Sequence, residues 1–291
     1  MYKKLYDDYV KNSADLYETI DDKKIISIDI PGTLCLDNAF SIEKDGNGYI
    51  LDVYVTDVVT FLNYNRPLAE EAYKKASSHY YETSKGVVRV SMLPDELSNN
   101  LLSLNHNGYK NVIHFVFNID SFGIIQNHNI KLSRIRKKFP LTYKGAESVL
   151  KDNTLYPAYD SLIHLREIAP VVLDNFGYNN AVTDIDAMSA LPSLMVNRLI
   201  AYDADTAIYK NSKSGTYTKR RSLTSASATP LRNFSSDINL ALYLYQYKLG
   251  NISDRDVYMI NDNLPKIIKH FNDVEYIDRY VKKLVKNHII L

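Results

Sequence analysis

Hydrophobic positions recur along this chain at two different spacings, which divide it into predicted helices and strands. Spacing near 3.6 residues predicts helices, and apolar runs or strict alternation predict strands. The pattern predicts helices over residues 3–20, 67–78 and 141–150 and strands over residues 25–30, 39–42, 49–62 and 114–120. Residues 156–209 are mostly helical in pattern, and residues 254–291 form a polar helical tail. Pro31-Gly32 ends the first strand and begins a loop.

The composition is that of an ordinary soluble globular protein, with 45% hydrophobic and 24% charged residues among 291. The net charge of +1 gives no overall attraction to nucleic acid, so RNA binding would depend on local basic patches. The single cysteine, Cys35, has no disulfide partner within the chain, which favours a reducing compartment. No apolar run approaches the ~20 residues that span a bilayer. We therefore expect a cytoplasmic protein without a membrane partner.

The loop after the first strand carries the candidate chemistry. Asp29 lies at its start and Asp37 at its end, so two carboxylates could converge at its mouth. Asp is also common in turns for backbone reasons, and turn capping is the alternative interpretation of both residues.

Two later segments give this loop a context. The strand from Tyr49 to Val58 comes first, and the segment from Met92 to Leu104 reads Met-Leu-Pro-Asp-Glu-Leu-Ser-Asn-Asn-Leu-Leu-Ser-Leu. In this order, the three segments resemble the catalytic domain of the RNB (ribonuclease II) family of 3′-to-5′ exoribonucleases. Those enzymes carry an acidic motif, a VHIADV-like strand and an MLPxxLSxxxxSL segment. The resemblance implies an α+β fold, in which helices flank a mixed sheet and the C-terminal half is helical.

The same resemblance exposes losses in the acidic motif. The family has four aspartates where this chain has Asp29, Cys35, Asp37 and Asn38, and a glutamate near the place of Leu191. Two divalent ions 4 Å apart repel by roughly 16 kcal/mol at an effective dielectric of 20, which four carboxylates offset in the enzymes. The two remaining acids imply at most one ion, so Mg²⁺ is expected to bind weakly or not at all.

The family's RNA contacts are partly retained. Tyr80 and Tyr143 match aromatic residues of the RNA channel, and stacking on such rings tolerates any base. Arg232 matches a phosphate-binding arginine of the active site. Arg134 and Arg136 lie in a basic segment before the predicted 141–150 helix. The alternatives are core tyrosines, a solvated strand face and, for Arg232, a structural ion pair.

The sequence therefore predicts a shortened RNB-like domain over residues 25–250, after an N-terminal helical extension over 1–24 and before a helical tail over 251–291. The leading hypothesis is an impaired nuclease, or pseudoenzyme, that binds single-stranded RNA. Two alternatives stay open. One is a scaffold subunit of a protein assembly, and the other is an active metal-dependent exoribonuclease.

Overall fold

The computed structural model describes residues 1–105, 108–136, 138–152, 154–178, 184–211, 214–219 and 225–287. The chain forms two compact units, and each is built from separate stretches of sequence. Unit 1 contains Met1–Tyr9, Val58–Leu101 and Asn197–Leu291, and unit 2 contains Val10–Asp57 and Leu102–Val196. No helix in the described part of the chain is long and apolar enough to cross a membrane. The domain boundaries expected from the sequence stay a prediction.

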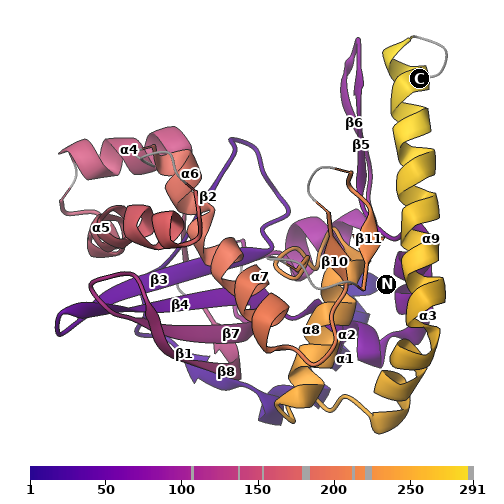
Figure 1. The fold of residues 1–291 in the computed structure, drawn as a ribbon, viewed down its shortest axis with the longest axis horizontal. Coiled ribbons are helices and arrows are strands. Elements are labelled where there is room, and N and C mark those ends of the chain that lie inside the picture. The colour runs from indigo at the N-terminus through magenta and orange to yellow at the C-terminus, as the bar shows by residue number, and fades with distance from the viewer. Residues whose placement is uncertain are drawn as a thin grey trace. The chain divides into compact units, whose positions relative to one another are not determined.

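Unit 2 is organised around a seven-stranded mixed sheet with the strand order β1-β8-β7-β4-β3-β2-β9 (Figure 1). Its strands are β1 (Glu18–Ile20), β2 (Ile25–Asp29), β3 (Asn38–Asp45), β4 (Gly48–Thr56), β7 (Lys110–Ile119), β8 (Ile125–Ile135) and β9 (Lys138–Thr142). The pairs β1–β8 and β2–β9 are parallel, and the remaining neighbours are antiparallel. The mixed sheet confirms the predicted fold class.

The centre of this sheet is buried on both faces. In β4, Leu51, Val53 and Val55 are fully buried on one face, and Asp52 and Tyr54 are buried on the other. A strand buried on both sides needs partners for its polar side chains as well as packing for its apolar ones. For Asp52 these partners are His114 of β7 and Ser41 of β3, and the Ser41 hydroxyl also contacts the Tyr54 hydroxyl.

After the sheet, the described residues of unit 2 contain the starts of four helices, α4 (Tyr143–Asp152), α5 (Tyr159–Asn175), α6 (Ile185–Ser189) and α7 (Leu191–Asp203). Helix α5 packs on β3, and the Ser161 hydroxyl donates to the Ile42 carbonyl at 3.3 Å. Leu162 and Leu165 on α5 are fully buried. Helix α7 continues into unit 1 from Asn197.

Unit 1 is mainly helical, which agrees with the predicted helical C-terminal half. Its other elements are α2 (Val58–Tyr64), α3 (Arg66–Lys75), β5 (His79–Thr83), β6 (Gly86–Val90), the π-helix η2 (Leu97–Leu101), β10 (Tyr209–Lys210), β11 (Tyr217–Thr218), α8 (Phe234–Gln246) and α9 (Asp254–Lys286). Helix α9 begins at its N-cap residue Ser253, whose hydroxyl accepts the Asp256 N–H at 3.1 Å.

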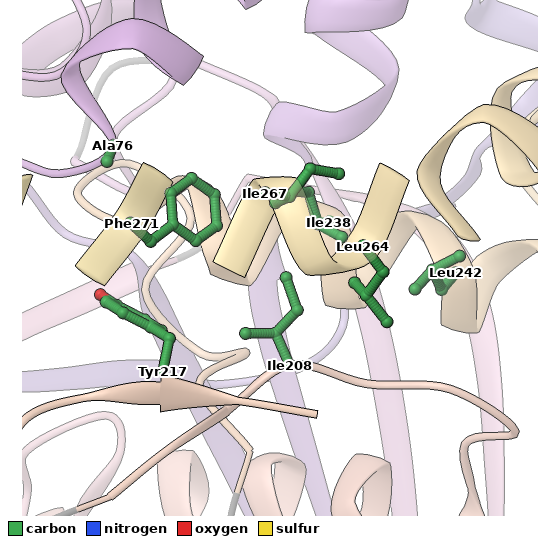
Figure 2. Packing of buried hydrophobic residues seen from close by; sticks show 8 residues of the cluster. All are labelled: Ala76, Ile208, Tyr217, Ile238, Leu242, Leu264, Ile267 and Phe271. Atoms are coloured by element: carbon green, nitrogen blue, oxygen red, sulfur yellow. The ribbon is translucent and has the colours of Figure 1, made fainter. Parts of the chain in front are cut away.

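The core of unit 1 joins α8 and α9 to the short strands. Figure 2 shows Leu264, Ile267 and Phe271 of α9 pointing toward Ile238 of α8 and Ile208, which precedes β10. Phe271 is 1% exposed, and its ring packs edge-on against Tyr217 at a centroid distance of 5.5 Å. Helix α9 is therefore part of the core and not a loose tail.

Two predicted elements are wrong. The helix expected over 3–20 ends early, because α1 (Tyr2–Asn12) gives way to the 3-10 helix η1 (Ala14–Leu16) and then to β1, which pairs with β8. The strand expected over 49–62 ends at Thr56, and the apolar residues beyond it form α2.

Candidate nucleic-acid site

The loop between β2 and β3 positions the two candidate acids in unit 2. Asp29 is the last residue of β2, is half-buried, and pairs with Thr142 of β9. Gly32 adopts a φ of +85°, which favours glycine, and lets the chain turn after Pro31. Asp37 at the far end of the loop is 3% exposed.

Hydrogen bonds hold the far end of this loop against β4 and against the segment that follows η2. The Thr56 N–H donates to the Asp37 carbonyl at 2.8 Å. Ser103 accepts the Leu36 N–H at 3.0 Å, and its hydroxyl donates to the Leu34 carbonyl at 2.6 Å. Ser103 belongs to the Met92–Leu104 segment that the sequence singled out, so one function of its end is to fix the loop that carries Asp37.

The neutral members of the acidic motif are held by packing and by one hydrogen bond. Cys35 is buried at 6% exposure. The Asn38 Nδ2 donates to the Ser193 Oγ of α7 at 3.1 Å. Leu191, where the sequence suggested a lost glutamate, is fully buried, and Ser193, two residues later on α7, makes the hydrogen bond to Asn38. Within the described residues, no three His, Cys, Asp or Glu side chains gather as a metal site.

Tyr143, the first residue of α4, lies close to further acids. Partial burial raises the pKa of Tyr143, and a hydrogen bond to Asp186 of α6 raises it further, with a smaller contribution from the charge of Asp29. Asp186 and Ser193 are thus neighbours of the predicted site that sequence reasoning missed. Asp186 lies on α6 and Ser193 lies on α7, and only helix packing shows which side chains turn toward the loop.

The guanidinium groups of Arg134 and Arg136, in the basic segment, differ in their exposure and in their hydrogen bonds. The Nε of Arg134 donates to Asn111 Oδ1 at 3.1 Å within the sheet, and its buried Nη2 has no hydrogen-bond partner among the described residues. Arg136 is exposed, with its guanidinium 5.3 Å from the Tyr109 ring centroid. Arg136 is therefore better placed than Arg134 to meet a ligand.

In unit 1, the structure brings the segments of Tyr80 and Arg232 together. The Ser78 N–H donates to the Arg232 carbonyl at 2.8 Å, two residues before Tyr80 on β5. The Tyr80 side chain is 41% exposed, and the guanidinium of Arg89 on β6 lies 6.0 Å from its ring centroid. Arg232 itself is half-buried in the turn before α8. Arg89 is a neighbour of Tyr80 that the sequence alone did not indicate.

Comparisons with known proteins identify the family to which this sequence is similar. The profile of the RNB domain matches residues 17–182. The chain belongs to the RNB family. Ribonuclease R of Chlamydia muridarum is 29% identical over 149 residues, which cover 51% of this chain and 21% of that protein. The match therefore spans about a fifth of that relative's length.

Solved structures agree on the fold. Mycoplasma genitalium RNase R, in complex with double-stranded RNA, superposes with a TM-score of 0.80 at 16% identity, covering 95% of this chain and 66% of that one. Yeast Ssd1, described as a pseudonuclease, superposes with a TM-score of 0.68 at 12% identity, covering 92% of this chain and 44% of that one. At these identities the likeness concerns the fold alone.

Proposed function

We propose that this chain binds single-stranded RNA through its RNB-type surface and hydrolyses it poorly or not at all. The observation that carries the proposal is the hydrogen bond between two neutral side chains, Asn38, which directly follows Asp37, and Ser193 of α7. With buried Cys35, these groups add no negative charge to that of Asp29 and Asp37. Such a donor set does not fit two magnesium ions, whose mutual repulsion requires several carboxylates to offset.

The same neutrality favours RNA binding without metal. Carboxylates without bound cations repel phosphate, and each neutral replacement removes part of that repulsion. The ring of Tyr143 remains at the start of α4, and Tyr80 remains exposed on β5. Aromatic stacking contributes about 1–3 kcal/mol per base and does not depend on sequence. That the RNase R neighbour was solved with RNA, and that Ssd1 is a pseudonuclease, supports both parts of the proposal.

A binding experiment tests the first part. Fluorescence anisotropy with a labelled single-stranded RNA at low salt should show the same affinity in EDTA and in Mg²⁺. Tyr143→Ala should weaken binding about 10-fold, and Tyr143→Phe should retain it because the ring remains. The control is Tyr178→Ala, which removes a different tyrosine of unit 2, one that is exposed. No measurable affinity at low salt, where phosphate contacts are strongest, would rule out RNA binding.

A cleavage assay tests the second part. Purified protein with 5′-labelled single-stranded RNA and Mg²⁺ or Mn²⁺ should leave the RNA at full length. Processive shortening that Asp37→Asn abolishes would instead establish the active exoribonuclease, with Asp37 as a metal ligand and Arg232 as the predicted phosphate contact.

A structural role in a protein assembly is the second candidate, because α9 exposes large side chains on its surface. Tyr258, Tyr276 and Tyr280 are each between 58% and 69% exposed. Exposed aromatic residues are enriched where proteins bind each other. This role predicts no RNA affinity, so the anisotropy experiment separates the two candidates.

A further inference from the structure

The hairpin of β5 and β6 in unit 1 has an open strand edge. Among the described residues the two strands form a sheet of their own, and β6 pairs with β5 alone. Its apolar side chains face solvent, with Val87 65%, Val88 39% and Val90 45% exposed. An exposed, valine-rich edge strand offers unpaired N–H and C=O groups to another strand. Natural proteins usually protect such an edge, so its exposure indicates that another strand pairs with it.

The hairpin is held in a fixed position. The imidazole of His79 on β5 lies 2.9 Å from the buried carboxylate of Asp278 on α9, which also pairs with Lys282 at 2.7 Å. The guanidinium of Arg89 donates to Asn99 Oδ1 at 2.5 Å. Figure 1 shows the hairpin as a long projection beside α9. A strand already fixed in its bound conformation loses little entropy when it pairs.

The register of the hairpin shows which backbone groups are available. Thr83 pairs with Gly86 across a two-residue loop, and residues that flank such a loop exchange hydrogen bonds with each other. Hydrogen-bonded and non-hydrogen-bonded pairs then alternate along an antiparallel ladder. Val88 therefore bonds inward to β5, whereas the N–H and C=O groups of Val87 and Arg89 point to the open side. These two residues are placed symmetrically about Val88.

We propose that β6 pairs antiparallel with β6 of a second copy of this chain, about a two-fold axis at Val88. In this register Val87 of each copy lies opposite Arg89 of the other, and both residues have outward N–H and C=O groups. The pairing gives four backbone hydrogen bonds. The two Val88 side chains meet on the axis as a non-hydrogen-bonded pair, in which side chains approach most closely.

Charge favours this register and this occupant. Arg89 meets Val87 and Lys85 meets Ser91, so no like charges lie directly opposite each other. A two-fold axis at Arg89 would place the two guanidinium groups opposite each other, which is destabilising. Single-stranded RNA fits this edge less well. Arg89 already donates a hydrogen bond to Asn99, and the other residues of β6 offer only backbone groups and valine side chains, which carry no positive charge for a phosphate. The contact area is small, so the dimer is weak and concentration-dependent.

The association state of the full chain tests the proposal. Sedimentation equilibrium over a range from about 1 to several hundred micromolar should show a monomer–dimer equilibrium. Val87→Pro removes an N–H group that the hairpin does not use internally, so the hairpin should persist while the dissociation constant rises roughly 30-fold. A monomer at every concentration, or a dimer that Val87→Pro leaves unchanged, overturns the proposal.

A charge exchange at Val88 tests the axis itself. Val88→Lys and Val88→Glu should each abolish the dimer, because each places like charges opposite each other, and an equimolar mixture should restore it as a heterodimer. The control Val90→Lys puts the same charge on the same strand opposite Gly86, so it should still dimerise. Failure of the mixture to associate overturns the two-fold register. Loss of RNA affinity in both Val88 variants, without any dimer in the unmodified chain, would assign the edge to RNA.

Discussion

At the level of single residues, the loop around Asp37 combines burial with neutrality. Cys35 is buried, and Asn38 satisfies its amide with the hydroxyl of Ser193. Neutral groups in these positions can lie close to Asp37 without a cation between them. Carboxylates in the same positions would repel one another unless a metal ion neutralised them. These neutral side chains therefore need no cation between them.

Adding acids in and beside this loop should make stability depend on metal. The triple variant Cys35→Asp, Asn38→Asp, Ser193→Glu should unfold at a lower temperature than the unmodified chain in EDTA, and Mg²⁺ should raise its Tm. A ligand at 100 times its Kd stabilises the folded state by about 2.7 kcal/mol. The unmodified chain should show little or no such rise. Differential scanning calorimetry with and without Mg²⁺ measures both effects.

The control for this prediction is Leu34→Asp, which adds an acid to the same loop at a side chain that is 61% exposed. It should give no metal-dependent change in Tm. A triple variant whose Tm does not respond to Mg²⁺ would show that the loop cannot assemble a metal site even with these acids added.

A buried row of polar residues crosses the sheet of unit 2. The His114 Nε2 of β7 donates to Asp52 Oδ1 of β4 at 2.8 Å, and its Nδ1 accepts from the Ser133 hydroxyl of β8 at 3.1 Å. Ser133 is fully buried, so this Ser–His–Asp row has no access to a substrate and is structural. Burial lowers the pKa of His114 more than the hydrogen bond to Asp52 raises it. Burial would raise the pKa of Asp52, but His114 and Lys23 outweigh it and the pKa is lowered.

These shifts predict a loss of stability on acidification. In the unfolded chain, His114 takes up a proton near pH 6.5, while the folded chain keeps it neutral. The unfolded state therefore binds more protons below that pH, and the free energy of unfolding falls as the pH falls. Asp52 adds a further loss below its ordinary value of 3.8. Urea unfolding at pH 7 and pH 5.5 should show a His114 contribution of about 1 kcal/mol.

His114→Gln should reduce this difference between the two pH values, because glutamine does not titrate. His128→Gln, on the neighbouring β8, is the matched control and should leave the difference as it is in the unmodified chain. An equal pH dependence in His114→Gln and the unmodified chain would contradict the assignment.

At the level of elements, the sequence pattern predicted the end of an element correctly where residues that disfavour a strand follow it directly. Pro31-Gly32 interrupts an apolar run, and β2 ends at Asp29 as the break indicates. The prediction failed between β4 and α2, because the apolar pattern continues past Thr56 into Val58–Tyr64 without a turn signal. The pattern gives no strands for the β5–β6 hairpin, since its side chains are mostly exposed and do not alternate in polarity.

The candidate site could be predicted in part for a similar reason. Cys35 and Asp37 lie in the loop between β2 and β3, and Asp29 and Asn38 lie at its two ends, so the sequence alone places all four in one segment. Ser193 is 155 residues from Asn38, and which side chain of α7 turns toward the loop depends on helix packing. The family resemblance put the lost glutamate near Leu191, which is fully buried.

Asn197 of α7 fixes the loop before α8 within unit 1. Its side-chain Oδ1 accepts the N–H groups of Ser227 at 2.8 Å and Ala228 at 3.1 Å. Asn197→Ala should leave both donors without that acceptor and destabilise the protein by about 2 kcal/mol. Hydrogen exchange should show faster exchange at these two amides. Asn197→Asp keeps the acceptor oxygen and should lose less protection, so equal losses in both variants would contradict this role.

At the level of the whole molecule, neither compact unit is a continuous stretch of sequence. The chain passes between the units after Tyr9, Asp57, Leu101 and Val196. The strands that make the unit 2 sheet come from residues 10–57 and 102–196, so this sheet does not use α9. Unit 1, in contrast, takes Leu264, Ile267 and Phe271 of its core from α9.

A chain shortened to residues 1–249 should therefore lose one unit and keep the other. Without α9, Ile208, Ile238 and Leu242 lose their apolar cover, and truncating even one large core side chain costs about 3–5 kcal/mol. Hydrogen exchange should show unprotected amides in α8 and retained protection in β4 and β7. The point variant Phe271→Ala should give a milder form of the same result, and Tyr276→Ala, at an exposed position of α9, should have almost no effect. Full protection of α8 in the shortened chain would mean that α9 only covers a core that is already stable.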